Sequence, residues 1–258
     1  MEQRKQKEIE YYNRQAQRVL EIREVDKVDF EGFYPLVLSS YSFLYRLIEK
    51  FCRKGEVLDY GCGNGIHSVF IAKQGAEVIG IDLSEKSLEI ATKRIKKEEM
   101  EDKIEFLKMD CEKLDFPNNF FDVIFDGGTF SSLDLSKAYP ELLRILKPRG
   151  HLIGIETFGH NPFTNLKRKI NKSIGKRTSW AAEHILKIDN LEEAKKYFNK
   201  IEVYYFHLIS WLAFPFLNLA WGKALLKLLE SIDRVLLKIP FFEKYVFKVV
   251  FVFSEPKK

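Results

Sequence analysis

The chain has 258 residues, of which 46% are hydrophobic and 31% are charged, so it is long enough to bury a full hydrophobic core. Its formal net charge of +5 is too small and too dispersed to argue by itself for nucleic acid, which we do not expect as a partner. The three cysteines, Cys52, Cys62 and Cys111, lack paired metal-ligand spacing, and an odd number argues against a disulfide framework. We therefore expect one α/β domain in a reducing cytoplasm, without a metal site.

Residues 1–55 are predicted to form an N-terminal helical cap. Residues 5–20 have helical character, and residues 35–51 carry apolar side chains at helical spacing. The second segment leads through Gly55 into a strand, and we expect its helix to cover one face of a sheet. The first ten residues, MEQRKQKEIE, are polar and lack the apolar core of a signal peptide, which argues against secretion by that route.

Residues 56–157 are predicted to form the core of the domain. The sequence VLDYGCGNG at residues 57–65 joins an apolar strand to a glycine-rich turn, where the backbone can take positive φ angles and approach a ligand closely. Further strands, expected at residues 77–81, 104–108, 121–125 and 152–156, alternate with helices at residues 66–74, 85–97 and 135–146. This alternation predicts a parallel sheet with helices on both faces. Such sheets bind ligands beyond the carboxyl ends of their strands.

The spacing of the glycines distinguishes two kinds of cofactor-binding turn. The dinucleotide fingerprint has a third glycine or alanine at the position that Ile66 occupies here. Instead, three glycines alternate, and Asp59 stands two positions before the first. This arrangement resembles motif I of class I S-adenosylmethionine-dependent methyltransferases, and the resemblance covers about residues 57–156. It implies that the three glycines, Gly61, Gly63 and Gly65, line the methionine part of the cofactor and that Asp59 helps to position its ammonium group.

Acidic residues follow three further strands, and the resemblance assigns roles to them. Asp82 would accept hydrogen bonds from both ribose hydroxyls, a feature that dinucleotide-binding proteins share. Asp110 would accept from the adenine amino group, although a plain turn aspartate is the alternative, and the same alternative applies to Asp126. The predicted cofactor-binding residues are Asp59, Gly61, Cys62, Gly63, Gly65, Asp82, Leu83, Asp110, Cys111 and Asp126.

The resemblance also implies a Rossmann-like α/β fold. Its doubly wound, mostly parallel seven-stranded sheet would end in an antiparallel hairpin, here expected at residues 201–209 and 245–253, with helical cap insertions. N-terminal helices of this family often fold back over the cofactor. Tyr11 and Tyr12 are candidates for that role, with simple packing as the alternative.

Residues 158–188 are predicted to be a basic substrate-cap insertion. Its basic residues have no acid between them and are Lys167, Arg168, Lys169, Lys172, Lys176 and Arg177. Phe163, Leu166, Ile170 and Ile174 form an apolar set at helical spacing, so we expect one helix face to pack while the other is basic. The insertion is either an ordinary solvated helix or a surface that meets an anionic acceptor or an anionic membrane.

Two histidines of this insertion are candidate general bases. His160 lies in a loop shaped by Pro162, and His184 stands beside Glu183. A histidine titrates near neutrality and could take a proton from a hydroxyl acceptor. An ordinary structural position is the alternative for both.

Residues 189–258 are predicted to complete the same domain, with an amphipathic helical insertion at about residues 211–243. The stretch at residues 203–222 lacks Asp, Glu, Lys and Arg, and its length approaches a membrane span of about 20 residues. Polar positions such as His207, and the opening YYF pattern, instead suit a strand. Both interpretations are kept at this stage.

The amphipathic insertion has a charged stripe that consists of Lys223, Lys227, Glu230, Arg234 and Lys238. Aliphatic residues fill the rest of this helix. It therefore packs against the core of its own domain, packs against another subunit, or lies in a membrane interface and admits a lipid-like acceptor.

The predicted activity is transfer of a methyl group from S-adenosylmethionine to a small-molecule or lipid-like acceptor, which the basic cap suggests is anionic. O-methylation or C-methylation is favoured. The alternatives are a non-catalytic S-adenosylmethionine-binding module and a nicotinamide-dependent oxidoreductase, which Ile66 disfavours. The expected location is the cytoplasm, with membrane association on the cytoplasmic face if the amphipathic helix meets lipid. The oligomeric state is left open.

Overall fold

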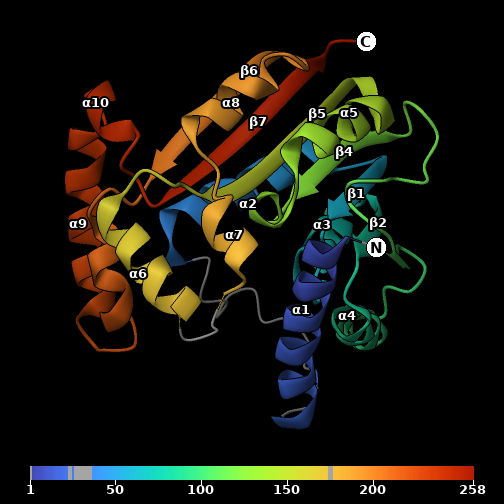
Figure 1. Ribbon diagram of the computed structural model, residues 1–258, viewed down its shortest axis with the longest axis horizontal. Helices are drawn as coiled ribbons and strands as arrows, with labels where there is room; N and C mark the ends of the chain where they lie inside the picture. Colours follow the sequence, from blue (N-terminus) through green and yellow to red (C-terminus); the bar gives the residue numbers. More distant parts are fainter. Residues whose placement is uncertain (1, 23–24, 26–36, 174–176) are drawn as a thin grey trace.

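One mixed sheet organises the chain. The computed structural model describes residues 2–22, 25, 37–173 and 177–258 (Figure 1). Within these residues, seven strands pair in the order β3-β2-β1-β4-β5-β7-β6. The strands are β1 (Glu56–Tyr60), β2 (Glu77–Asp82), β3 (Ile104–Lys108), β4 (Phe121–Asp126), β5 (Leu146–Thr157), β6 (Phe198–Phe206) and β7 (Lys248–Pro256).

Helices of the described residues cover both faces of the sheet and extend beyond one of its edges. The helices are α1 (Gln3–Ile22), α2 (Ser39–Phe51), α3 (Ile66–Lys73), α4 (Glu85–Glu98), α5 (Leu135–Ile145), α6 (Pro162–Ser173), α7 (Ser179–Glu183), α8 (Ile188–Ala194), α9 (Gly222–Leu236) and α10 (Pro240–Glu243). Two short 3₁₀ helices are η2 (Phe130–Ser132) and η3 (Ser210–Phe216). Figure 1 shows α6, α9 and α10 gathered at the end of the molecule opposite to α4.

The strand order places a switch point beside β1. β1 pairs in parallel with both β2 and β4, so the chain runs outward from β1 in opposite directions along the sheet. Because loops diverge at such a point, a crevice opens beyond the carboxyl ends of these strands. β7 is antiparallel to both β5 and β6. The expected doubly wound, mostly parallel sheet with an antiparallel terminal pair is confirmed.

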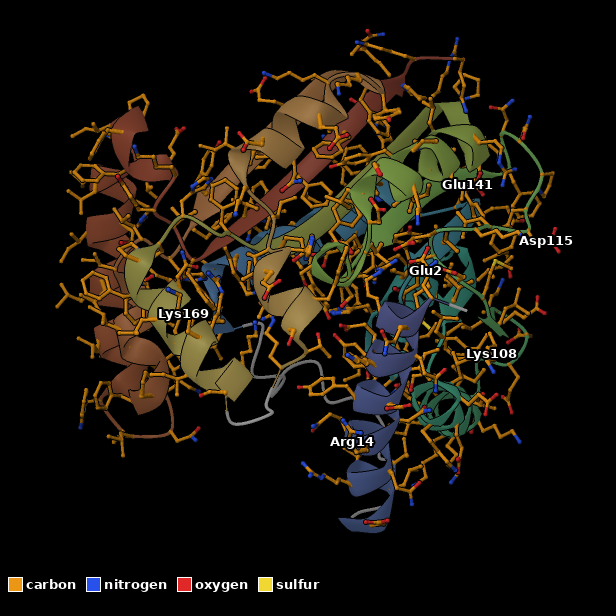
Figure 2. All side chains as sticks on the ribbon, in the orientation of Figure 1. Glu2, Arg14, Lys108, Asp115, Glu141 and Lys169 are labelled. Atoms are coloured by element: carbon orange, nitrogen blue, oxygen red, sulfur yellow. The ribbon has the colours of Figure 1, made fainter. Side chains whose placement is uncertain are left out.

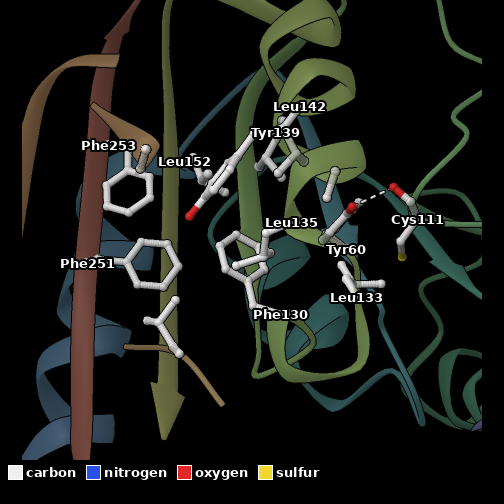
Figure 3. Packing of buried hydrophobic residues seen from close by; sticks show 14 of the residues in the cluster. Tyr60, Cys111, Phe130, Leu133, Leu135, Tyr139, Leu142, Leu152, Phe251 and Phe253 are labelled. Carbon is white, nitrogen blue, oxygen red and sulfur yellow. Dashed lines mark hydrogen bonds between the residues drawn. The ribbon is translucent and has the colours of Figure 1, made fainter. Parts of the chain in front are cut away.

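The hydrophobic core lies on the two faces of this sheet. On one face, aromatic rings from β1, α5 and β7 pack together, as Figure 3 shows for Tyr60, Tyr139 and Phe251, all of which are fully buried. The other face is covered by aliphatic residues of α2, α3 and α4. The hydroxyl of Tyr60 donates to the carbonyl of Cys111 at 2.5 Å, so its one polar atom is satisfied inside the core. This bond fixes the loop after β3 against β1.

Several expected strand boundaries differ from the structure, most of them in the last three strands. β5 begins at Leu146 rather than at residue 152, because Leu146 pairs with Phe121 ahead of a register shift in the β4–β5 ladder. β6 ends at Phe206, before His207, whose φ of +64° breaks the extended conformation. β7 starts three residues later than expected because it pairs from Lys248 onward. The residues between β6 and β7 form the expected helical insertion.

The uncharged stretch at residues 203–222 is divided among several elements. It contains the end of β6, the whole of η3 and the turn into α9. Within the part of the chain that the structure describes, no helix is both long enough and apolar enough to cross a membrane.

Helix α6 faces the opposite way from its expected orientation. The prediction placed Phe163, Leu166 and Ile170 on the packed face, but their side chains are 68%, 60% and 53% exposed. The buried residues are Thr164 and Arg168. Arg168 donates to the carbonyl of Phe158 and to the side chain of Asn165, which fixes the helix through its polar side. Two further residues of the predicted pattern, Ile174 and Lys176, lie outside the described residues.

Candidate active site

The glycine turn after β1 has the conformation that its glycines allow. Gly61 and Gly63 have φ angles of +75° and +52°, values that side chains other than glycine rarely adopt. A Cβ atom on Gly61 would lie 2.2 Å from the hydroxyl oxygen of Thr129, whereas one on Gly63 would meet nothing within 4 Å. The turn is therefore packed on one side at Gly61 and open to a ligand at Gly63.

Asp82, at the end of β2, connects this turn to the next helix. One carboxylate oxygen accepts from the backbone N–H of Gly63 at 3.0 Å, and the other accepts from that of Ser84 at 2.7 Å. Burial raises the pKa of this carboxyl group. A carboxylate has about four acceptor positions, so Asp82 retains capacity for the hydroxyls of a ligand. Its neighbour Leu83 contacts the same space.

A cavity of about 220 Å³ lies at the carboxyl ends of β1, β2 and β4. Its lining comes from the strand ends and from the N-terminal helix α1. The residues that line it are Arg4, Lys5, Glu8, Ile9, Tyr12, Gly61, Gly63, Asp82, Leu83, Ser84, Ser87, Asp110, Cys111, Glu112, Gly127, Gly128, Thr129, Ser132 and Leu133. We call this space the donor cavity.

Helix α1 forms one wall of the donor cavity. Arg4 donates to both carboxylate oxygens of Glu112 and to the carbonyl of Ser132, while Lys5 lies 2.6 Å from the carboxylate of Asp110. These contacts join the first turn of α1 to the loop that follows β3. The helix is therefore held over the strand ends by charged groups that also border the cavity.

Farther along α1, a second contact joins this helix to α4. The side-chain oxygen of Asn13 accepts from the hydroxyl of Ser84 and from the backbone N–H of Lys86. Tyr12 lies between the two attachments and lines the donor cavity. The position of α1 over the cavity agrees with the expectation that an N-terminal helix folds back over the site.

The other predicted cofactor-binding residues fall into two groups. Asp110 and Cys111 border the donor cavity, although one oxygen of Asp110 is already paired with Lys5. Asp59 and Cys62 are buried and do not border it. Gly65 packs toward Ala91, with no space for a Cβ atom. The structure thus brings Gly61, Gly63, Asp82, Leu83, Asp110 and Cys111 together around one space.

Asp59 is placed behind the glycine turn. One of its carboxylate oxygens accepts from the hydroxyl of Ser68 on α3 at 2.5 Å. Burial raises the pKa of Asp59 to about 7. The carboxyl group therefore connects β1 with α3, and its role toward an ammonium group stays a prediction. Burial also raises the pKa of the Cys62 thiol well above its ordinary value, so this thiol is not a nucleophile near neutral pH.

A second cavity of about 300 Å³ adjoins the first. Both are lined by Tyr12, Gly127 and Gly128. The remaining lining is mostly polar and comes from α1, from η2, from the end of β5, from the start of β7 and from the basic insertion. It consists of Tyr11, Ser131, Glu156, Thr157, Asn171, Arg177, Thr178, Ala181 and Lys248. We call this space the acceptor cavity.

Two buried carboxyl groups lie near the ends of neighbouring strands. Glu156, near the end of β5, lines the acceptor cavity, whereas Asp126, at the end of β4, is fully buried and borders neither cavity. Burial raises the pKa of both groups, and the charge of Glu156 raises that of Asp126 further. One oxygen of each carboxyl group is buried and has no hydrogen-bond partner. Such buried acceptors usually receive a hydrogen bond or hold a proton, so each group is a candidate to hold a proton.

Basic side chains complete the acceptor cavity. Lys248 lines it from the first position of β7, where it is paired in register with Thr157. Arg177 donates to the hydroxyl of Ser131 at 3.2 Å, while its buried Nε has no partner. The cavity therefore combines one carboxyl group with two cationic groups.

The two candidate histidines lie away from both cavities. Nε2 of His160 accepts from the backbone N–H of Ile188 at 3.2 Å. The ring of His184 stacks on Trp180 with 3.5 Å between the ring centroids. Neither histidine borders the donor or acceptor cavity, so the structure offers no geometric support for either as a general base.

The sequence-based prediction assigned no role to several residues that border the two cavities. Glu156 had a usable signal, since it is an acid at the end of a buried strand, as Asp82 and Asp126 are. Lys248 had none, because only the β5–β7 register brings it to the cavity. The first-turn residues Arg4 and Lys5 also had none, since surface charges on a helix are common.

Comparison with known proteins finds similarity over the central part of the chain. A family model described as a methyltransferase domain matches residues 58–154. The demethylmenaquinone methyltransferase of Bacteroides fragilis is 34% identical over 107 residues, which cover 40% of this chain and 44% of that protein. The sterol 24-C-methyltransferase of Aspergillus fumigatus is 36% identical over 97 residues, which cover 37% and 26% of the two chains. The chain therefore spans less than half the length of these curated relatives.

Solved structures resemble the chain over a longer stretch. The geranyl diphosphate C-methyltransferase of Streptomyces coelicolor A3(2), solved with geranyl diphosphate and S-adenosyl-L-homocysteine, has a TM-score of 0.65 and covers 98% of both chains at 15% identity. At that identity the similarity shows the fold. It extends beyond the family match to the cap insertions and the terminal strands.

Proposed function

We propose that this protein, of which residues 58–154 match a methyltransferase domain, transfers a methyl group from S-adenosylmethionine to a small-molecule or lipid-like acceptor. The observation that carries the proposal is the junction of the two cavities at Tyr12, Gly127 and Gly128. Direct transfer requires donor and acceptor to lie side by side with water excluded. Two adjoining cavities beneath one helix meet that requirement.

The donor cavity offers open space and hydrogen-bond acceptors that S-adenosylmethionine could use. The space above Gly63 is open to the methionine part, and Asp82 has free acceptor capacity for ribose hydroxyls. Asp110 lies on the side where the adenine would bind. When bound, this cofactor supplies a methyl group made electrophilic by a sulfonium. The chain itself orients the two reactants and closes the space with α1.

The acceptor cavity suits a compound with a polar, anionic end. Arg177 and Lys248 offer positive charge, and Asn171 offers an amide. The relatives named above act on a demethylmenaquinone and a sterol, and a structural neighbour was solved with geranyl diphosphate. These names support a small or lipid-like acceptor for this chain, with O-methylation or C-methylation favoured.

We propose that Glu156 accepts the proton that the acceptor loses. The residue lines the acceptor cavity, one of its carboxyl oxygens has no hydrogen-bond partner, and burial raises its pKa from the ordinary carboxyl range to about 7. A base of that strength holds a proton more readily than an exposed carboxylate and is still deprotonated in part near neutral pH. The nearby ammonium group of Lys248 opposes this shift by lowering the pKa of Glu156, which favours the deprotonated carboxylate that acts as the base.

The proposal is tested by calorimetry with S-adenosylmethionine and with NAD. We expect saturable binding of S-adenosylmethionine at one site and none of NAD, and the opposite result would refute the assignment. Incubation of labelled cofactor with fractionated extract then separates an enzyme from a binding module. Label in an extractable small molecule or lipid supports transfer, whereas binding without transfer across all fractions supports the module.

We further propose that the protein works in the cytoplasm. The cysteines Cys52, Cys62 and Cys111 are free and buried, which is usual for a reducing compartment. Fractionation of cells that produce the tagged protein would test this assignment, and recovery from the culture medium would contradict it.

A further inference from the structure

Exposed apolar side chains gather on one part of the molecule. Of the 14 large hydrophobic residues that are exposed among those described, 12 lie either on α6 or between Leu212 and Phe241, and the two others are Tyr12 and Ile188. We call these 12 residues the apolar face. They are Phe163, Leu166, Ile170, Leu212, Phe216, Leu219, Trp221, Leu228, Ile232, Val235, Ile239 and Phe241.

The apolar face follows the periodicity of its helices. On α9 and just beyond it, Leu228, Ile232, Val235 and Ile239 recur at the spacing of one helical stripe. The buried side of that helix is formed instead by residues such as Leu226. Helices α6 and α9 thus each pack against the protein through one set of residues and expose a separate apolar stripe to solvent. A monomer in water gains nothing from the outward stripe.

Two contacts between aromatic rings connect segments of this region. The ring of Phe163, at the start of α6, lies 6.4 Å from that of Trp211 in η3, measured between centroids. Phe216 and Trp221 are in contact farther along, with 5.2 Å between their centroids. Figure 1 shows α6, α9 and α10 at the same end of the molecule.

Basic and acidic side chains of this region lie on different sides of helix α9. Helix α9 has exposed basic residues that include Lys223, Lys227 and Arg234, whereas both of its acids point inward. Asp233 is buried and accepts from three backbone N–H groups at residues 208–210. Glu230 accepts from the backbone N–H of Ser39. The outward surface of the helix is therefore apolar and positively charged.

Helix α6 repeats this arrangement. Lys167 and Lys169 are exposed on either side of its apolar stripe, and the helix contains no acid. Its Lys172 is paired with Glu183 and is thus partly neutralised. On the inner side of the same helix, Asn171 lines the acceptor cavity. A single helix therefore separates the acceptor cavity from the apolar face.

We propose that the apolar face docks on the surface of an anionic lipid bilayer. Apolar stripes bordered by lysines are the features by which interfacial helices bind, with the aliphatic side chains at the acyl boundary and the ammonium groups at the anionic headgroups. Trp221 is exposed at the edge of the face, and tryptophan favours this interface. The exposed lysines beside the apolar stripes complement the charge of an anionic bilayer. They would have no such counterpart on a neutral apolar partner, so we take anionic lipid as the occupant of the face.

The position of α6 gives the docking a further consequence. If the proposed methyl transfer is correct, a lipid-like acceptor would pass from the bilayer past α6 into the acceptor cavity. The docking itself rests on exposed residues and charges alone. It can therefore be tested without cofactor and without turnover, and its failure would leave the proposed methyl transfer untouched.

Vesicle sedimentation tests the docking. The full chain is mixed with phosphatidylcholine vesicles that contain or lack phosphatidylglycerol, and bound protein is measured. We expect binding to the anionic vesicles that weakens as salt is added. The variant Leu228→Ser/Ile232→Ser/Val235→Ser should bind at least about tenfold more weakly. The variant Lys223→Glu/Lys227→Glu/Lys238→Glu should lose about 100-fold or more.

Matched controls separate docking from general surface effects. Ile188→Ser removes an exposed apolar side chain outside the face, and Lys54→Glu/Lys96→Glu/Lys113→Glu makes the same charge change elsewhere. Both should bind as the unaltered protein does. Circular dichroism checks that every variant is folded, and Leu166→Ser on α6 provides a second position if the α9 variant is not.

Three results would overturn the proposal. One is no binding to anionic vesicles, and another is equal loss of binding in the controls and the face variants. The third is self-association in sedimentation velocity that the serine variant abolishes while vesicle binding is absent, since the face would then be covered by a second copy.

Discussion

Arg4 and Glu112, 108 positions apart in the chain, form an ion pair in which Nη2 of Arg4 donates to both carboxylate oxygens, at 2.7 and 2.8 Å. The side chain of Glu112 is only 1% exposed, and that of Arg4 is 11% exposed. Hydrogen bonds between two charged groups are stronger than those between neutral groups. This pair attaches the first turn of α1 to the loop that borders the donor cavity.

Removal of this attachment should affect both stability and cofactor binding. Arg4→Ala removes a positive charge and two hydrogen bonds from the buried carboxylate of Glu112. This change should lower the free energy of unfolding by about 1–3 kcal/mol. Affinity for S-adenosylmethionine should fall, because α1 is a wall of the cavity. Urea unfolding and calorimetry measure the two effects. Arg14→Ala, at an exposed position of the same helix (Figure 2), should change neither, and equal effects of the two substitutions would contradict this account.

The two glycines of the turn should respond differently to alanine. Gly63→Ala places a methyl group in open space, so stability should fall only by about 1 kcal/mol for the left-handed backbone. S-adenosylmethionine affinity should fall by about tenfold or more if the cofactor occupies that space. Gly61→Ala overlaps Thr129 and should reduce stability more strongly than Gly63→Ala. Thermal unfolding with and without cofactor compares them, and unchanged affinity in Gly63→Ala would place the cofactor elsewhere.

Glu156→Gln tests the proposed proton acceptor. The neutral amide keeps the size of the side chain but cannot take the proton, so methyl transfer should slow by about 100-fold, with cofactor affinity retained. In the unaltered protein the rate should rise with pH through the raised pKa of Glu156, because the deprotonated form is the base. That rise should be absent in the variant. Glu105→Gln, at an exposed position of β3, should keep both rate and pH profile.

His207 should make stability depend on pH. Its ring contacts the hydroxyls of Ser40 and Ser210, each at 2.9 Å, and burial lowers its pKa to about 3. Lys248 acts in the same direction, and Glu230, 3.7 Å away, does not offset the burial. The unfolded chain binds a proton below its ordinary pKa of about 6.5, whereas the folded chain does not. The stability from this neutral ring is thus present above pH 6.5 and is lost as pH falls toward 3.

The variant His207→Asn isolates that contribution, since asparagine tolerates the left-handed backbone at this position. Near pH 7.5 it should be less stable by about 1–3 kcal/mol, because two hydrogen bonds are lost. By pH 5 the difference should narrow by about 2 kcal/mol. Urea unfolding across this range measures it, and a constant difference would mean that the ring does not titrate as described.

The donor side of the site could be predicted from sequence because its determinants are local. The alternating glycines and Asp82 each belong to one strand and the turn that follows it, and parallel strands bring such turns to one edge. The family match to residues 58–154 confirms the predicted class of domain. The same rule extended to Glu156 would have found the acid of the acceptor cavity.

The acceptor side could not be predicted in the same way, because its contacts are non-local. Lys248 reaches the cavity through the antiparallel β5–β7 register. For α6, apolar spacing indicated which residues share a face but not which face would pack. The buried hydrogen bond from Arg168 to Phe158 decides that orientation, and no periodicity in the sequence records it.

The two cavities also differ in when they can be completed during synthesis. Every residue that lines the donor cavity lies between Arg4 and Leu133, whereas the acceptor cavity needs Lys248 from the last strand. Chains emerge from the ribosome N-terminus first, so the donor residues are all translated long before the strand that closes the acceptor side. If the proposed methyl transfer is correct, all residues of the donor site are made before the acceptor site can form, and pairing of the final strand completes the arrangement that transfer needs.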